Sequence, residues 1–130
     1  MRILFLAVLL FALSLLAACG GNSSQTTTQT MPASTTISLV TNPNPARVGD
    51  VELRFTVTDP SGQPVTGANF DVFADHIDMS GMTMHGSATE QGEGVYAITA
   101  NFSMSGNWKL STEVKKGDLS HKQDIELKVQ

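Results

Sequence analysis

Two histidines and three methionines lie close together near the middle of this chain, in the segment His76-Ile77-Asp78-Met79-Ser80-Gly81-Met82-Thr83-Met84-His85. Neutral imidazole nitrogen and thioether sulfur are soft ligands. Together they suit copper, Cu(I) above all, better than hard cations such as Mg²⁺ or Ca²⁺. Methionine also suits a compartment outside the cytoplasm, because it cannot form a disulfide as cysteine can. The segment therefore predicts a copper site.

The spacing of the methionines indicates how such a site could form. If the chain around Met82 and Met84 is extended, both side chains point the same way, because residues two apart in a strand share a face. Gly81 allows the backbone to turn, so that His76 and Met79 can approach the two sulfurs. A soft site with three or four ligands is therefore sterically feasible.

Met104 is a further candidate from a more distant segment. It continues the alternation of a core-facing row that starts at Tyr96, so we expect it at the rim of the fold, where it could meet the loop. His121 has no sulfur neighbour in sequence and is expected to be a surface histidine. The predicted ligands are His76, Met79, Met82, Met84, His85 and Met104, with Met82, Met84 and His85 at the centre.

Methionine is more often a gap-filling core residue than a ligand, and this reading competes with the metal site. The polar, flexible residues Ser80, Gly81, Thr83 and Gly86 make the segment a poor place for three core methionines. Two alternatives to copper remain open. One is a non-metal protein–protein interaction module with an adaptable Met-rich contact loop, and the other is a sacrificial methionine site that absorbs oxidants.

Other chemistry has weaker support. Asp71, Asp75 and Asp78 could suggest calcium, but the 12-residue loop pattern with its glycine and final glutamate is missing. The sequence also has no Gly-x-Ser-x-Gly elbow, no phosphate-binding loop and no His-Glu-x-x-His motif. We therefore predict that the protein is not an enzyme.

Apolar and polar residues alternate in short segments separated by Pro, Gly, Asn and Asp, which is typical of β-strands joined by turns. The strand starting at Val51 and the last strand, ending at Val129, show this pattern clearly. The spacing predicts an all-β fold, an immunoglobulin-like two-sheet sandwich of about seven antiparallel strands. A small open barrel is the alternative.

The N-terminus reads as a lipoprotein signal. One positive charge at Arg2 precedes an apolar run that ends in small residues, and Leu16-Ala17-Ala18-Cys19 resembles the bacterial lipobox. Cys19, the only cysteine, would then carry the lipid (palmitate among its acyl groups) and anchor the protein to a membrane. The alternatives are an ordinary secretory signal followed by a free thiol, or an uncleaved anchor.

Three regions are therefore expected: a signal peptide at 1–18, a lipidated Cys19 with a flexible Ser/Thr/Gln linker at 19–36, and one domain at 37–130. The location would be the cell envelope, facing the periplasm or the exterior. Eight basic against twelve acidic residues argue against nucleic acid as a partner. We expect a monomer whose partners are the membrane and a copper client or membrane protein.

The domain also resembles the YtkA-like family of small bacterial envelope proteins, which is similar to the periplasmic part of FixH-like proteins. The resemblance rests on the order of loose motifs: the segments 42–49 and 59–68, the Met-containing loop, Gly94-Val95-Tyr96 and 102–108. It implies a β-sandwich, and an association with copper handling or oxidase assembly. Many members have fewer Met and His in this loop, so the resemblance alone does not imply metal binding.

Overall fold

The computed structural model describes residues 34–130, which form seven β-strands. The predicted signal peptide, Cys19 and most of the predicted linker lie outside the described residues. Within residues 34–130 the chain has no helix that could cross a membrane. The strands are β1 (Thr36–Asn42), β2 (Gly49–Thr58), β3 (Asn69–His76), β4 (Thr83–Gly92), β5 (Val95–Phe102), β6 (Gly106–Lys116) and β7 (Leu119–Val129).

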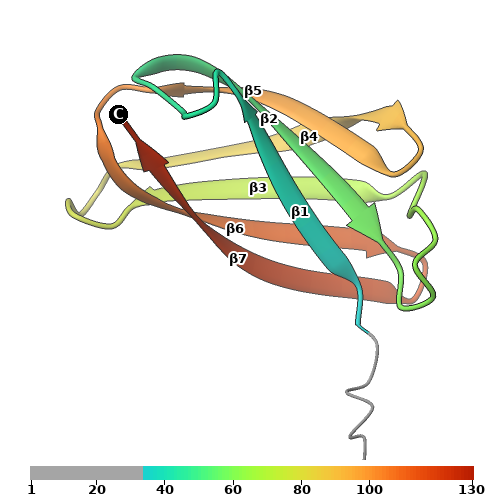
Figure 1. Ribbon diagram of the computed structural model, residues 1–130. Helices are drawn as coiled ribbons and strands as arrows, with labels where there is room; N and C mark the ends of the chain where they lie inside the picture. The colour runs from blue at the N-terminus through green and yellow to red at the C-terminus, as the bar shows by residue number, and fades with distance from the viewer. Residues whose placement is uncertain (1–33) are drawn as a thin grey trace, which may run out of the picture.

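All the strands pair antiparallel, in the order β1-β2-β5-β4-β3-β6-β7 (Figure 1). Strands β1, β2 and β5 make one layer, and β3, β6 and β7 make the other. Strand β4 belongs to both: residues 83–88 pair with β3, and residues 89–92 pair with β5. The predicted all-β sandwich of about seven antiparallel strands is confirmed, with β4 passing from one layer to the other.

The alternation seen in the sequence sets which side chains fill the space between the layers. Every second residue of β2, β3, β5 and β6 faces inward, as period-two strands require. Aromatic rings join the layers, with centroids 4.8 Å apart for Phe55 and Phe70 and 5.3 Å apart for Phe70 and Tyr96. The largest fully buried side chains are Trp108, Tyr96, Phe55, Phe70, Phe102, Leu53 and Leu110.

The seam between the two outer strands, β1 and β7, is closed by hydrogen bonds at both ends, at one end from β1 itself and at the other from the β1–β2 loop. The Gln123 side chain accepts from the Ile37 amide (3.1 Å) and donates to the Ile37 carbonyl (2.9 Å). At the other end, Val48 N donates to the Gln130 carbonyl and Gln130 N donates to the Ala46 carbonyl, each at 2.9 Å. The sheet therefore closes on itself almost as a barrel does.

One strand was not anticipated, and one sequence expectation failed. Residues 83–92 form a strand, although the apolar alternation in this Gly-, Ser-, Thr- and Glu-containing stretch is weak, because pairing with β3 and β5 overrides local propensity. His121 was expected at the surface, and this was wrong. Strand β7 directs it inward, so that it is half-buried with its Nε2 atom buried.

Candidate metal site

His76 is the last residue of β3 and is only 7% exposed. Its ring meets Trp108 edge to face at 4.8 Å, because the two residues are partners across the β3–β6 pairing. His76 Nε2 lies 3.1 Å from the Ser105 carbonyl oxygen. A carbonyl can only accept, so Nε2 carries the hydrogen and the neutral ring keeps its free lone pair on Nδ1.

That Nδ1 atom is buried and has no hydrogen-bond partner among residues 34–130. A buried polar atom without a partner costs about 1–3 kcal/mol, so most such atoms in folded proteins are satisfied. Metal-binding histidines are commonly held by a carbonyl on one nitrogen while the other nitrogen binds the metal. The Ser105 carbonyl and the free Nδ1 of His76 reproduce this arrangement.

Met82 is the cross-strand partner of His76. His76 N donates to the Met82 carbonyl at 3.0 Å, so the two residues form a directly opposed pair on the same face. Such pairs place their Cβ atoms roughly 5 Å apart. Met84 lies one step further along the same inward face, opposite Ala74. Both methionines are half-buried and pack against the core, so His76, Met82 and Met84 come together.

Two loops meet over His76. They are the β3–β4 loop, residues 77–82, and the β5–β6 loop, residues 103–105. The Asp78 carboxylate accepts from Asn107 N (3.1 Å) and from Asn107 Nδ2 (3.2 Å), while Ile77 N donates to the Asn107 carbonyl (2.8 Å). These bonds fix the first loop against the start of β6.

Gly106 makes this close approach possible. Its φ is +132°, and a Cβ placed there would lie 2.7 Å from His76 Nε2 and 3.2 Å from an oxygen of Asp78. Any other residue would push into the histidine ring, which the buried Trp108 supports from the side. Glycine is therefore required by both the backbone conformation and the space.

Met79 and Met104 are the exposed members of the set. Met79 is 46% exposed in the β3–β4 loop, and Met104 is 38% exposed in the β5–β6 loop. The Met104 carbonyl accepts from Trp108 Nε1 at 3.3 Å, which places this loop beside the tryptophan that contacts His76. Both methionines thus lie at the His76 end of the domain, in the two loops that meet there.

His85 lies on the opposite face of β4 from Met82 and Met84. It stacks on Phe73, with ring centroids 4.5 Å apart, on the outer surface of the sheet. The structure therefore makes His76 the imidazole that accompanies the two methionines. His85 as a ligand stays a prediction, and it would need a different set of partners.

The donor types fit a soft metal better than a hard one. No group of three or more His, Cys, Asp or Glu side chains within residues 34–130 could hold a metal ion. Asp71 and Asp75 are on the outward face of β3, and Asp78 is engaged with Asn107. A free imidazole nitrogen beside thioethers is instead the set expected for Cu(I).

Sequence reasoning missed the supporting residues Asp78, Ser105, Gly106 and Trp108. The signals present were the Ser-Gly-Asn turn before Trp108 and an aspartate two residues after His76. Their role depends on two loops that meet in space, which no local pattern reveals.

The structure shows a small all-β domain with histidine and methionine side chains gathered at one end. A family model described as YtkA-like matches residues 31–113, and the chain belongs to the YtkA-like family. Comparison with curated protein sequences gives no significant match.

Two solved structures share the fold at low sequence identity. The PmoD soluble domain from Methylocystis sp. ATCC 49242 (Rockwell) is 10% identical with a TM-score of 0.50, covering 74% of this chain and 90% of that one. An engineered protein is 11% identical with a TM-score of 0.53, covering 77% of this chain. The matched part is only 21% of that engineered protein. Both likenesses concern the fold alone.

Proposed function

We propose that this YtkA-like protein binds copper, as Cu(I), and acts as a metallochaperone or buffer of the cell envelope rather than as an enzyme. The observation that carries the proposal is the buried Nδ1 of His76, which has no partner among residues 34–130 and has Met82 as its cross-strand neighbour. His76, Met82 and Met84 would hold the ion, and Met79 and Met104 would be the exposed donors.

Each side chain has a distinct part in this proposal. The Ser105 carbonyl holds the imidazole through Nε2 and leaves Nδ1 as the nitrogen that would bind the ion. The thioethers add no charge, so the ion is held without a buried ion pair and can be released again. Exposed Met79 and Met104 could meet incoming copper first, or pass it to a client protein. The lipid anchor at Cys19 would keep the protein at a membrane facing the periplasm or the exterior.

A Cu(I) titration against a competing chelator tests the proposal. The buried residues described in 34–130 form one hydrophobic core, so the test protein is residues 19–130 with Cys19→Ser, which removes the one thiol that would also bind Cu(I). The double variant Met82→Leu/Met84→Leu keeps the volume but removes the sulfur. It should bind Cu(I) at least about tenfold more weakly, a loss of about 1.4 kcal/mol.

A matched pair of histidine variants sharpens the result. His76→Gln should weaken Cu(I) binding, whereas His85→Gln, on the outer face, should not. Trp108 is the only tryptophan and touches His76, so its fluorescence reports binding at this end directly. Equal affinity in all four proteins, or no binding in any, would contradict the copper function.

A further inference from the structure

A gap separates β4 from β5 over the part of β4 nearest to the candidate metal site. Pairing between the two strands is confined to residues 89–92 of β4 and 95–97 of β5. Beyond this, β4 follows β3 into one layer, while β5 stays with β2 in the other. The two strands therefore diverge toward the end of the domain that carries His76 (Figure 1).

Strand β4 presents free backbone groups to this gap. Hydrogen-bonded pairs alternate along an antiparallel ladder. The bond from His76 N to the Met82 carbonyl shows that Met82 directs its backbone groups to β3. Every second residue of β4 does the same, so Met84 and Gly86 also direct their N–H and C=O groups to β3. The N–H and C=O groups of the residues between them point away from β3 toward the gap. These residues are Thr83, His85 and Ser87.

Strand β5 presents a matching edge. Val57 N bonds to the Gly94 carbonyl, so Tyr96, Ile98 and Ala100 direct their backbone groups to β2 by the same alternation. Thr99 and Asn101 therefore face β4. Two unpaired strand edges thus oppose each other, and such edges readily pair with an added strand.

The gap opens onto an apolar cavity of about 170 Å³. Apolar side chains from four strands line most of it, among them Leu53, Val72, Met84 and Ile98, while His85, Thr99 and Asn101 add polar groups. Ile98 Cδ1 lies only 2.6 Å from where a Gly86 Cβ would be, so the Ile98 side chain reaches across the gap. A strand that binds in the gap would have to turn this side chain aside to place its own apolar side chains in the cavity. Met84 is the flexible member of this lining and can adapt to different shapes.

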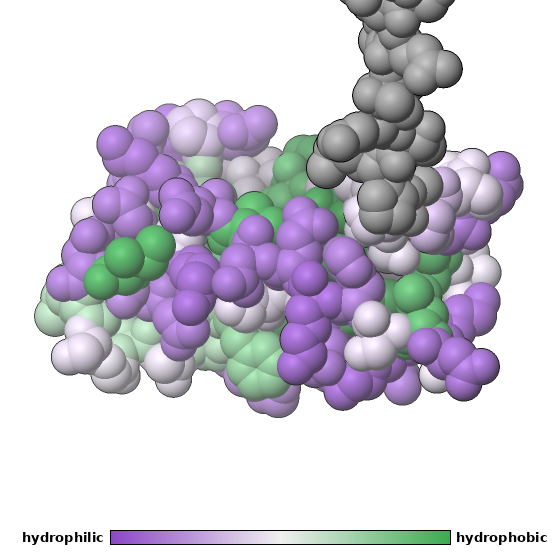
Figure 2. Space-filling model, turned by 90° about the horizontal axis from the view of Figure 1, so that it is seen from below, coloured by the Kyte–Doolittle hydropathy of each residue, from purple (hydrophilic) through white to green (hydrophobic). Residues whose placement is uncertain are grey.

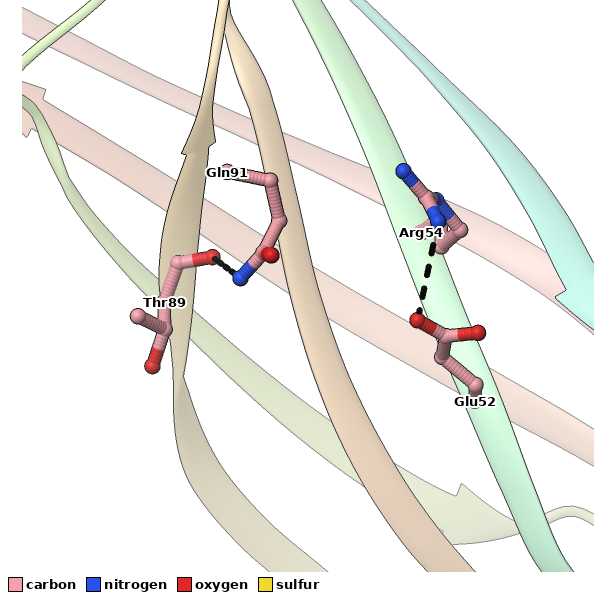
Figure 3. A network of polar contacts seen from close by, with 4 residues as sticks. All are labelled: Glu52, Arg54, Thr89 and Gln91. Carbon is pink, nitrogen blue, oxygen red and sulfur yellow. Dashed lines mark hydrogen bonds and ion pairs between the residues drawn. The ribbon is translucent and has the colours of Figure 1, made fainter.

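The charges around the gap favour a basic occupant. Strands β2 to β5 carry Asp50, Glu52, Asp71, Asp75 and Glu90, but only one Lys or Arg, which is Arg54. Arg54 is already paired with Glu52 at 3.8 Å on the outer face (Figure 3). Lys109, opposite Asp75, lies one strand further away on β6. A second copy of this acidic domain would meet like charges here.

Other parts of the fold offer less to a partner strand. The β1–β7 seam is bridged at both ends, through Gln123 and Gln130. The surface seen from below mixes hydrophilic areas with several separate hydrophobic patches (Figure 2), and the outward residues of β7 include the charged Lys122, Asp124 and Glu126. A pocket also lies between β1 and β7, lined in part by Ile37, Leu39, Ile125 and Leu127, but there the two edges are already linked at both ends of the seam. Among the described residues, the β4–β5 gap offers two facing edges that no such bonds link.

We propose that the gap between β4 and β5 binds an extended, basic segment of a partner protein, which pairs with the β4 edge and places alternate apolar side chains in the cavity. The backbone of Thr83, His85 and Ser87 supplies the hydrogen bonds, and the acidic side chains on β2 and β3 attract the basic ones. This docking site does not depend on copper, and it lies beside Met82 and Met84, where a copper client would need to be.

Binding of a short capped peptide of alternating valine and lysine to residues 19–130 carrying Cys19→Ser tests the site. In ¹⁵N spectra without copper, the amide signals of Thr83, His85, Ser87, Thr99 and Asn101 should shift. The same peptide with alternate amides N-methylated cannot pair along one edge, and should bind at least about tenfold more weakly. Shifts confined to β1 or β7, no binding, or equal binding of the two peptides would overturn the proposal.

Variants of the protein test the contribution of the cavity to peptide binding separately from that of the acidic side chains. Ala100→Leu fills the cavity and should weaken peptide binding while the spectrum stays folded. Asp71→Asn/Asp75→Asn should weaken binding more than Asp118→Asn/Asp124→Asn, which removes the same charge from the β6–β7 side. Equal effects of the two double variants would reject the basic-strand partner. So would self-association through β4, seen by sedimentation, since a second copy would then fill the gap.

Discussion

His76 combines three constraints at one position: burial, a hydrogen bond on Nε2 and an unpartnered Nδ1. Any one of them occurs in ordinary core histidines. Their combination leaves a buried lone pair without a partner, on a residue whose cross-strand neighbour is Met82, and this is costly unless something binds there. The environment of His76 is therefore the strongest physical reason to expect a bound ligand.

Gly106→Ala should displace the His76 ring, because the new Cβ would lie against its Nε2 atom. The new Cβ would lie 2.7 Å from Nε2 at a φ of +132°, so the ring or the loop must move. We expect a loss of about 1–3 kcal/mol in the free energy of unfolding and weaker Cu(I) binding. Denaturant unfolding followed by Trp108 fluorescence measures the first effect, and chelator competition measures the second.

Gly117→Ala is the matched control. Gly117 also has a positive φ, +55°, but a Cβ there meets nothing within 4 Å. It should cost about 1 kcal/mol of stability through backbone conformation alone and leave Cu(I) binding unchanged. If the two variants affect copper equally, Gly106 does not position the histidine.

At the scale of elements, Tyr96 connects β5 to the segment that leads into β3. Its hydroxyl donates to the Val65 carbonyl (2.9 Å) and accepts from Ala68 N (3.1 Å), and the side chain is fully buried. Burial raises the pKa of Tyr96 most, and the nearby Glu90 charge raises it further, against the lowering by the Ala68 bond. The folded state therefore keeps the phenol proton more firmly than the unfolded chain does.

Tyr96→Phe should lower stability by about 1–3 kcal/mol, because two buried backbone groups lose their partner. The raised pKa gives a pH dependence with a definite sign. Stability from Tyr96 is fully present below the unfolded pKa of about 10, and is lost as pH rises through the folded value. The wild type should thus lose stability at alkaline pH faster than Tyr96→Phe does.

Denaturant midpoints of the two proteins, measured by Trp108 fluorescence from neutral to alkaline pH, test this expectation. Every other side chain is the same in both proteins, so the difference between the curves isolates Tyr96. Tyr96 is the only tyrosine, and tyrosinate absorbance follows its ionisation directly. Parallel curves would show that the hydroxyl carries no linked proton.

At the scale of the whole molecule, one end of the seam between β1 and β7 is closed by a single amide side chain, that of Gln123. Gln123 replaces a missing strand pair by bonding to both backbone groups of Ile37. Gln123→Ala should cost about 1–3 kcal/mol and speed hydrogen exchange at the Ile37 amide. This edge would then resemble an ordinary free edge strand, with a greater tendency to aggregate.

Gln91→Ala is the matched control for this closure. The Gln91 side chain is exposed and bonds only to the Thr89 carbonyl two residues away, at 3.2 Å (Figure 3). Its loss should change stability by no more than about 0.5 kcal/mol. If both variants unfold at the same denaturant concentration as the wild type, the seam is closed by other contacts.

Much of this molecule could be predicted from local pattern. The alternation around Val51 and Tyr96, and before Val129, correctly indicated strands and their inward faces, because side chains of a strand point to opposite sides in turn. The same rule applied to Met82 and Met84 gave their common face. It also puts His85 on the other face, and the pairing of β4 with β3 fixes this placement.

The sequence by itself determined the kinds of candidate donor, the family resemblance and the all-β fold, since residue types and short periods are local properties. The tertiary structure decided which of these side chains meet. The β3–β4 register put His76 opposite Met82, and the approach of the β5–β6 loop supplied the Ser105 carbonyl. The passage of β4 between the layers opened the gap beside β5. These features depend on pairings between distant residues, and pairing register is set by the packing of the whole core rather than by any one segment.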